Sequence, residues 1–97
     1  MRRRLSYRSA DVAALFRERT GRVARSVKAY RGVGRGSAVS VWGVRSEERL
    51  YFVVIGRAVE IFSGGDPGQR WSAAQPAAEA YRRYLELHPE EAGGGSS

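Results

Sequence analysis

Basic and aromatic residues are interleaved along the chain, and this pairing of residue types is what a single-stranded nucleic acid requires. Guanidinium and ammonium groups meet phosphates, while aromatic rings offer flat faces on which bases stack. The sequence carries 17 lysines and arginines against 10 aspartates and glutamates, a formal net charge of +7. The residues that we expect to contact nucleic acid are Arg22, Lys28, Tyr30, Arg31, Arg35, Trp42, Arg45, Arg49, Tyr51 and Phe62.

The positive charge is concentrated in the first half of the chain. Residues 1–45 contain 12 basic and two acidic residues, a net charge of +10, whereas residues 46–97 contain five basic and eight acidic residues, a net charge of −3. Such an asymmetry favours an anionic partner on one side of the molecule. The 16 arginines against one lysine also fit a second interpretation, in which arginine is simply the common surface residue of this chain.

Residues that carry other kinds of chemistry are scarce. The chain has no cysteine and a single histidine, which excludes disulfides, thiolate-bound metals and histidine-based metal centres. No spacing typical of a nucleophile with its base is present, so we expect no metal, no cofactor and no catalytic residue. If the protein cleaves RNA without a metal, Glu60 is the expected base, because we predict it to lie beside Lys28, Arg49 and Tyr51.

The length and the chain ends favour one small domain away from membranes. Three arginines at 2–4 precede no apolar segment, and no apolar run approaches the roughly 18 residues of a membrane span. We therefore expect a cytoplasmic protein with no membrane contact. Residues 9–91 form the expected single domain, residues 1–8 a flexible basic arm, and residues 92–97 a disordered glycine- and serine-rich tail.

Two helices and four strands are predicted within this domain. Ser9 is a typical N-cap for a helix over 10–20, and Gly21 is a typical residue after its end. A second helix begins after Ser72, which forms a capping box with the glutamine three residues on, and it ends at Pro89.

The four strands lie between these helices and are rich in valine, isoleucine and aromatic residues, with turn residues separating them. Because they are close in sequence, an antiparallel β-meander is the simplest connection. The expected fold class is α+β, with an N-terminal helix, a four-stranded antiparallel sheet and a C-terminal helix. The expected strands span 22–31, 37–44, 49–55 and 58–63.

The turns predict how the strands pair. A two-residue turn at Gly56 and Arg57 would place Ile55 opposite Ala58, because glycine tolerates the positive φ of such turns. A four-residue turn at 45–48 would place Val44 opposite Arg49.

With Ala29 opposite Val39, one face of the sheet becomes almost wholly apolar, and both helices are expected to cover it. The opposite face then carries a row of three rings across neighbouring strands, namely Trp42, Tyr51 and Phe62.

This aromatic row has three interpretations. If it is open beside Lys28 and Arg49, it is a platform for single-stranded nucleic acid. If the helices lie on opposite faces, the rings form a second core layer. If the row is covered by a second copy or by another protein, it is a protein interface.

The leading hypothesis is a small basic, non-enzymatic protein that binds single-stranded RNA or DNA through this basic and aromatic sheet face. The alternative is a protein-interaction module, either a homodimer or an inhibitor or toxin–antitoxin component that binds an acidic partner. A small metal-free ribonuclease is the third hypothesis.

Overall fold

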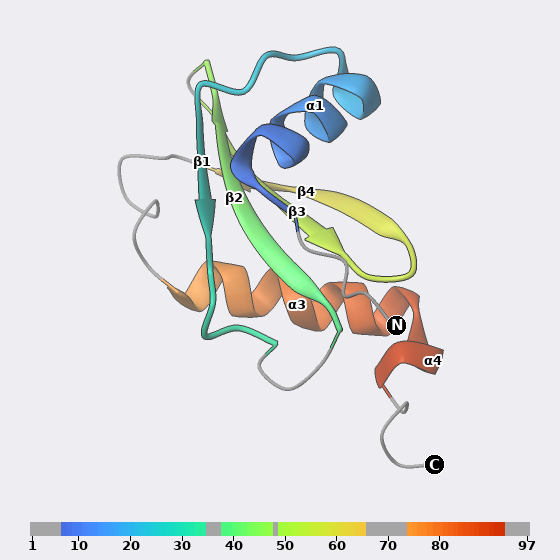
Figure 1. Ribbon diagram of the computed structural model, residues 1–97. Helices are drawn as coiled ribbons and strands as arrows, with labels where there is room; N and C mark the ends of the chain where they lie inside the picture. Colours follow the sequence, from blue (N-terminus) through green and yellow to red (C-terminus); the bar gives the residue numbers. More distant parts are fainter. Residues whose placement is uncertain (1–6, 35–37, 48, 66–73, 93–97) are drawn as a thin grey trace.

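Two helices flank a four-stranded sheet, in the order expected for the α+β class. The computed structural model describes residues 7–34, 38–47, 49–65 and 74–92 (Figure 1). Arg35, Ser72 and most of the predicted arm and tail lie outside the described residues. The elements are α1 (Ser9–Thr20), β1 (Ser26–Ala29), β2 (Ser40–Ser46), β3 (Arg49–Ile55), β4 (Val59–Gly65), α3 (Ala74–Leu87) and the short α4 (Pro89–Ala92).

The sheet is an antiparallel meander with the strand order β1-β2-β3-β4. The helices do not share one face of the sheet, because α1 packs on one side and α3 on the other (Figure 1). We call these two sides the α1 face and the α3 face. The expectation that both helices cover a single face is therefore wrong, and the sheet has an apolar layer on each side.

The two layers are formed by alternate residues of the same strands. Val12 and Phe16 of α1 are fully buried against one face, and Ala77 and Tyr84 of α3 are fully buried against the other. The buried sheet residues of the α1 face are Trp42, Val44, Val53 and Ile55. Those of the α3 face, with the adjoining Tyr30 and Val39, are Val41, Leu50, Phe52 and Val54.

Helix α1 begins one residue earlier than the N-cap prediction. Arg8 is the N-cap, and its backbone N–H donates to the Asp11 carboxylate over 2.9 Å. This bond closes the first turn around Arg8, so Ser9 is already helical. At the other end Gly21 has a φ of 76°, and its N–H donates to the carbonyl of Arg17, as expected for a left-handed residue after a helix.

The pairing of β3 with β4 differs from the prediction by one residue. Ile55 lies opposite Val59, so Ala58 belongs to the turn instead of the strand. Its N–H donates to the hydroxyl of Tyr84 over 3.1 Å, and its carbonyl accepts from the N–H of Gly56. A one-residue shift moves every side chain of a strand to the other face, so Phe62 lies opposite Phe52 on the α3 face.

The other two strand pairs are also shifted. Ala29 lies opposite Trp42 instead of Val39, an odd shift that exchanges the two faces of β1. Val44 lies opposite Tyr51 instead of Arg49, an even shift that keeps the faces of β2 and β3. The reason for the even shift is that β2 continues to Ser46, which leaves a tighter turn than the four residues expected.

Candidate nucleic-acid interface

The aromatic row predicted across the sheet does not form. Trp42 and Tyr51 lie on the α1 face, whereas Phe62 lies on the α3 face. Trp42 is 8% exposed and Tyr30 is 6% exposed, so neither ring presents a face on which a base could stack. Tyr30 packs against Phe52, with their ring centroids 5.8 Å apart. These aromatic side chains belong mainly to the two cores.

Helix α1 is what covers the centre of the α1 face. Phe16 is fully buried and tilts against Tyr51, with 5.2 Å between the ring centroids. The indole N–H of Trp42 donates to the Ser40 hydroxyl over 3.1 Å, which satisfies its polar atom within the layer. Tyr51 is only half-buried, and it is the ring of this face that lies beside a predicted phosphate contact, Arg22.

Four arginines from three segments gather at one end of the sheet. The segment after α1 runs beside the end of β2, because the N–H of Arg25 donates to the carbonyl of Arg45 over 2.7 Å. The hydroxyl of Ser46 also donates to the carbonyl of Val23 over 2.9 Å. Ser46 in turn lies opposite the first residue of β3. We call this cluster the basic end; it consists of Arg22, Arg25, Arg45 and Arg49.

The basic end presents charge on both sides of the sheet. Arg49 shares the α1 face with Tyr51, and Arg45 shares the α3 face with Leu50. Arg22, Arg25 and Arg49 are exposed, whereas Arg45 is partly buried. Three of these four residues were expected at the interface.

Arg25 is the member of the basic end that sequence reasoning missed, since it is absent from the residues expected to contact nucleic acid. Its short spacing from Arg22 in the sequence is the signal that could have identified it.

A carboxylate reaches this cluster in the described part of the chain. Glu47 Oε1 lies 3.6 Å from Arg22 Nη1, and both side chains are largely exposed. The guanidinium of Arg22 also lies 6.0 Å from the centroid of the Tyr51 ring. Glu47 has a φ of 56°, which is uncommon for a residue other than glycine. The turn between β2 and β3 thus places an acidic side chain beside Arg22.

Lys28 extends the positive charge along β1. It lies on the α3 face, where its ammonium is 5.2 Å from the Tyr30 ring. Ser26, two residues before it, pairs with Arg45, so Lys28 and Arg45 are diagonal neighbours on adjacent strands. Arg31 is exposed beyond the other end of β1 and is not part of the basic end.

The prediction that Glu60 lies beside Lys28, Arg49 and Tyr51 is wrong. Because of the register shift, Glu60 lies on the α3 face, away from the side shared by Tyr51 and Arg49. Its Oε2 instead lies 2.8 Å from Nε2 of His88, at the end of α3. The His88 ring stacks on Tyr84 with 4.6 Å between centroids. The contact between Glu60 and His88 joins the end of α3 to β4.

The described ranges contain neither a metal-binding cluster nor a membrane-spanning helix. In those residues no group of three or more histidines, aspartates and glutamates is arranged to hold a metal ion. None of the helices described is both long enough and apolar enough to pass through a membrane. No family model, curated protein or solved structure matches the chain.

Proposed function

We propose that the protein binds nucleic acid, and that phosphate contacts at the basic end carry the binding. The observation behind this proposal is the convergence of four arginines from three separate segments on one end of the sheet. Guanidinium groups donate to phosphate oxygens in a bidentate manner and stay charged at any physiological pH. Lys28 adds a fifth cation on the adjoining strand.

A site of this kind contacts the backbone of a nucleic acid more than its bases. Phosphate contacts fix position and affinity but carry no sequence information. Tyr51 is the half-buried ring beside Arg22, and it supplies a place for one base of a single strand. We therefore propose single-stranded RNA or DNA as the partner, with weak sequence preference. A protein with this function would work in the cytoplasm.

Salt titration tests the proposal. Fluorescence anisotropy would follow a labelled 20-nucleotide strand between about 50 and 400 mM NaCl. Four to five phosphate contacts predict a log–log slope of about −3, since each contributes roughly −0.7 for single strands. The variant Arg25→Gln/Arg49→Gln should reduce the slope by about 1.4. The control is Arg57→Gln/Arg82→Gln, which removes two exposed arginines outside the basic end.

Three results would contradict the proposal. One is the absence of binding at about 50 mM salt, and another is an equal loss of affinity in the control variant. The third is displacement of the labelled strand by poly-glutamate as readily as by an unlabelled strand. That last result would favour the alternative function, in which the partner is an acidic protein.

A further inference from the structure

The edge strand β4 lacks the residues by which proteins keep an exposed edge from pairing with another chain. Among the described strands it pairs with β3 alone, so its outer side has no neighbouring strand there. Lysine and proline commonly protect such edges, and β4 contains neither. The opposite edge, β1, has only four residues and carries Lys28. Of the two edges, β4 is therefore the one suited to the addition of a further strand.

The pairing with β3 determines which backbone groups of β4 point outward. The N–H of Gly56 donates to the carbonyl of Ala58 over 2.9 Å, which makes Ile55 and Val59 a pair that shares no hydrogen bond. Bonded and non-bonded pairs alternate along an antiparallel ladder, so Glu60 and the second residue after it bond to β3. The residues whose N–H and C=O groups face away from β3 are Val59, Ile61 and Ser63.

These outward groups can pair with the same groups of a second copy. A two-fold axis at Ile61 would place Ile61 opposite itself and Val59 opposite Ser63, and each such pair would exchange two hydrogen bonds. The irregularity between Leu50 and Tyr51 interrupts the regular ladder, so this pairing ends at Ser63. Val59 and Ile61 are half-buried apolar residues at the margin of the α1-face core, and a second copy would cover their exposed parts.

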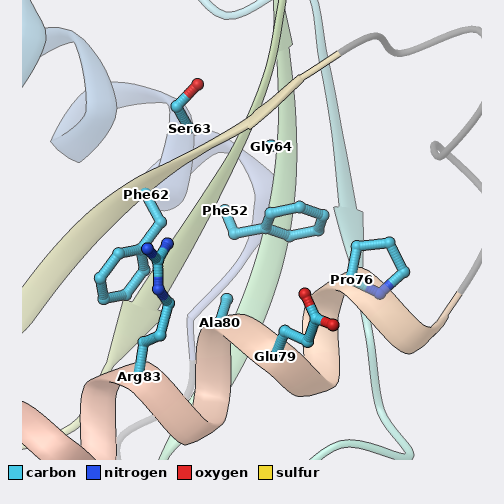
Figure 2. A pocket seen from close by; sticks show the side chains of 8 residues that line it. All are labelled: Phe52, Phe62, Ser63, Gly64, Pro76, Glu79, Ala80 and Arg83. Atoms are coloured by element: carbon cyan, nitrogen blue, oxygen red, sulfur yellow. The ribbon is translucent and has the colours of Figure 1, made fainter.

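The same register brings opposite charges together on the α3 face. Glu60 would lie opposite Phe62 of the second copy, in a pair whose side chains are close because no hydrogen bond joins their backbones. The guanidinium of Arg83 lies 5.6 Å from the centroid of the Phe62 ring, and Figure 2 shows the two side chains next to each other. Arg83 is exposed and forms no ion pair with any described residue. Each Glu60 carboxylate would therefore lie within reach of Arg83 of the second copy.

We propose that the protein forms a symmetric homodimer in which the β4 strands of two copies pair antiparallel and join their sheets into one. Self-pairing of Ile61 and the complementarity of Glu60 with Arg83 are the reasons for choosing a second copy as the partner. One short strand makes a small interface, and small interfaces are weak, so we expect a Kd on the order of tens of micromolar. None of these residues belongs to the basic end, so the dimer is independent of the function proposed above.

Sedimentation velocity of the free protein between about 5 and 500 µM tests the proposal, because this range spans the expected Kd. The sedimentation coefficient should rise with concentration from that of a monomer to that of a dimer. Hydrogen exchange then locates the contact. The amides of Val59, Ile61 and Ser63 should exchange more slowly at high protein concentration, whereas those of Glu60 and Phe62, already bonded to β3, should not change.

Two variants with matched controls identify the interface. Ser63→Pro removes an outward N–H and should raise the dimer Kd about tenfold, whereas Ser63→Ala keeps that N–H and should leave the Kd unchanged. Arg83→Glu places like charges opposite each other and should also raise the Kd about tenfold. Arg82→Glu makes the same change of charge at an exposed neighbour on α3 and should have no effect. If Ser63→Pro does not fold, Arg83→Glu decides, because it changes an exposed side chain.

Three outcomes would overturn the proposal. The first is a protein that stays monomeric up to about 500 µM, well above the expected Kd. The second is a dimer that Arg83→Glu leaves intact and in which the β4 amides gain no protection, because its contact would lie on another surface. The third is equal weakening by Arg82→Glu, which would indicate an effect of net charge instead of a contact between Glu60 and Arg83.

Discussion

Replacing Glu47 by glutamine should strengthen nucleic-acid binding while it weakens the fold. Glu47 lies 3.6 Å from Arg22, in the place that the proposed phosphate contact would take. A bound strand must displace this carboxylate or tolerate its charge, and both cost free energy. Glutamine keeps the length of the side chain and the unusual φ of 56°, so Glu47→Gln changes the charge alone. Glycine at this position would also relax the backbone and would confound the two effects.

The magnitude follows from the geometry of the pair. Two unit charges 3.6 Å apart in bulk water attract each other by about 1 kcal/mol. The side chains are 47% and 75% exposed, and pairs of that kind contribute roughly 0.2–1 kcal/mol after screening. Glu47→Gln should therefore lower the free energy of unfolding by about that amount. If a phosphate takes the place of the carboxylate, affinity should rise by about 1.4- to 5-fold.

Two measurements on the same variant check this reasoning. Anisotropy with a labelled single strand at about 50 mM NaCl gives the affinity, and urea denaturation gives the stability. The gain in affinity should shrink toward about 1 M salt, where the Debye length falls to roughly 3 Å. Equal or weaker binding by Glu47→Gln would refute the competition between Glu47 and phosphate. A gain that persists at high salt would refute its electrostatic origin.

Three further predictions concern the two cores and the caps. Tyr84→Phe should cost about 1–3 kcal/mol in urea denaturation, because the buried hydroxyl donates to Glu91 over 2.6 Å and accepts from the backbone N–H of Ala58. Burial, followed by the hydrogen bond to Glu91, raises the pKa of Tyr84, so wild-type stability should fall as pH rises above about 10, and less steeply in the variant. Phe16→Ala should cost about 3–5 kcal/mol and release the packing of α1 on Tyr51, seen as a loss of near-ultraviolet dichroism. Gly21→Ala should cost about 1–2 kcal/mol, through its φ of 76° alone, since no atom lies within 4 Å of the added methyl group; an unchanged urea midpoint would contradict this.

The order of the elements could be predicted from the sequence, because local signals determine it. Gly21 ends α1, Pro89 follows the end of α3, and valine-rich segments separated by turn residues form the strands. These signals act between residues that are close in the chain. No distant contact is needed to read them.

The pairing of the strands could not be predicted in the same way. Gly56 and Arg57 have the composition of a two-residue turn, yet Ala58 joins the turn because Tyr84 holds its backbone. Tyr84 lies 26 residues further along the chain, so this contact has no local signature. With Ala58 in the turn, the pairing of β3 with β4 shifts by one residue, Phe62 lies on the α3 face, and the expected aromatic row does not form.

The basic end could be predicted only in part, again because distant contacts assemble it. Arg22, Arg45 and Arg49 are recognisable as cations near turns, but their approach depends on backbone bonds such as that between Arg25 and Arg45. Those bonds depend on the position of β1, and the predicted register of β1 differs from the observed one by three residues. The charge of the site could be predicted, whereas its assembly at one end of the sheet could not.

The sequence does contain a signal for a sheet that is covered on both faces. Residues 50–55 of β3 are six consecutive apolar residues, and strands buried on both sides show such continuous runs instead of alternation. A sheet with both faces covered leaves little room on a face for cations, which must remain hydrated or meet an anion. They are therefore expected where the covering helices stop, at the ends and edges of the sheet. The basic end lies at such a boundary, beyond the C-terminus of α1, and this is why a binding surface is better sought there than among the buried rings.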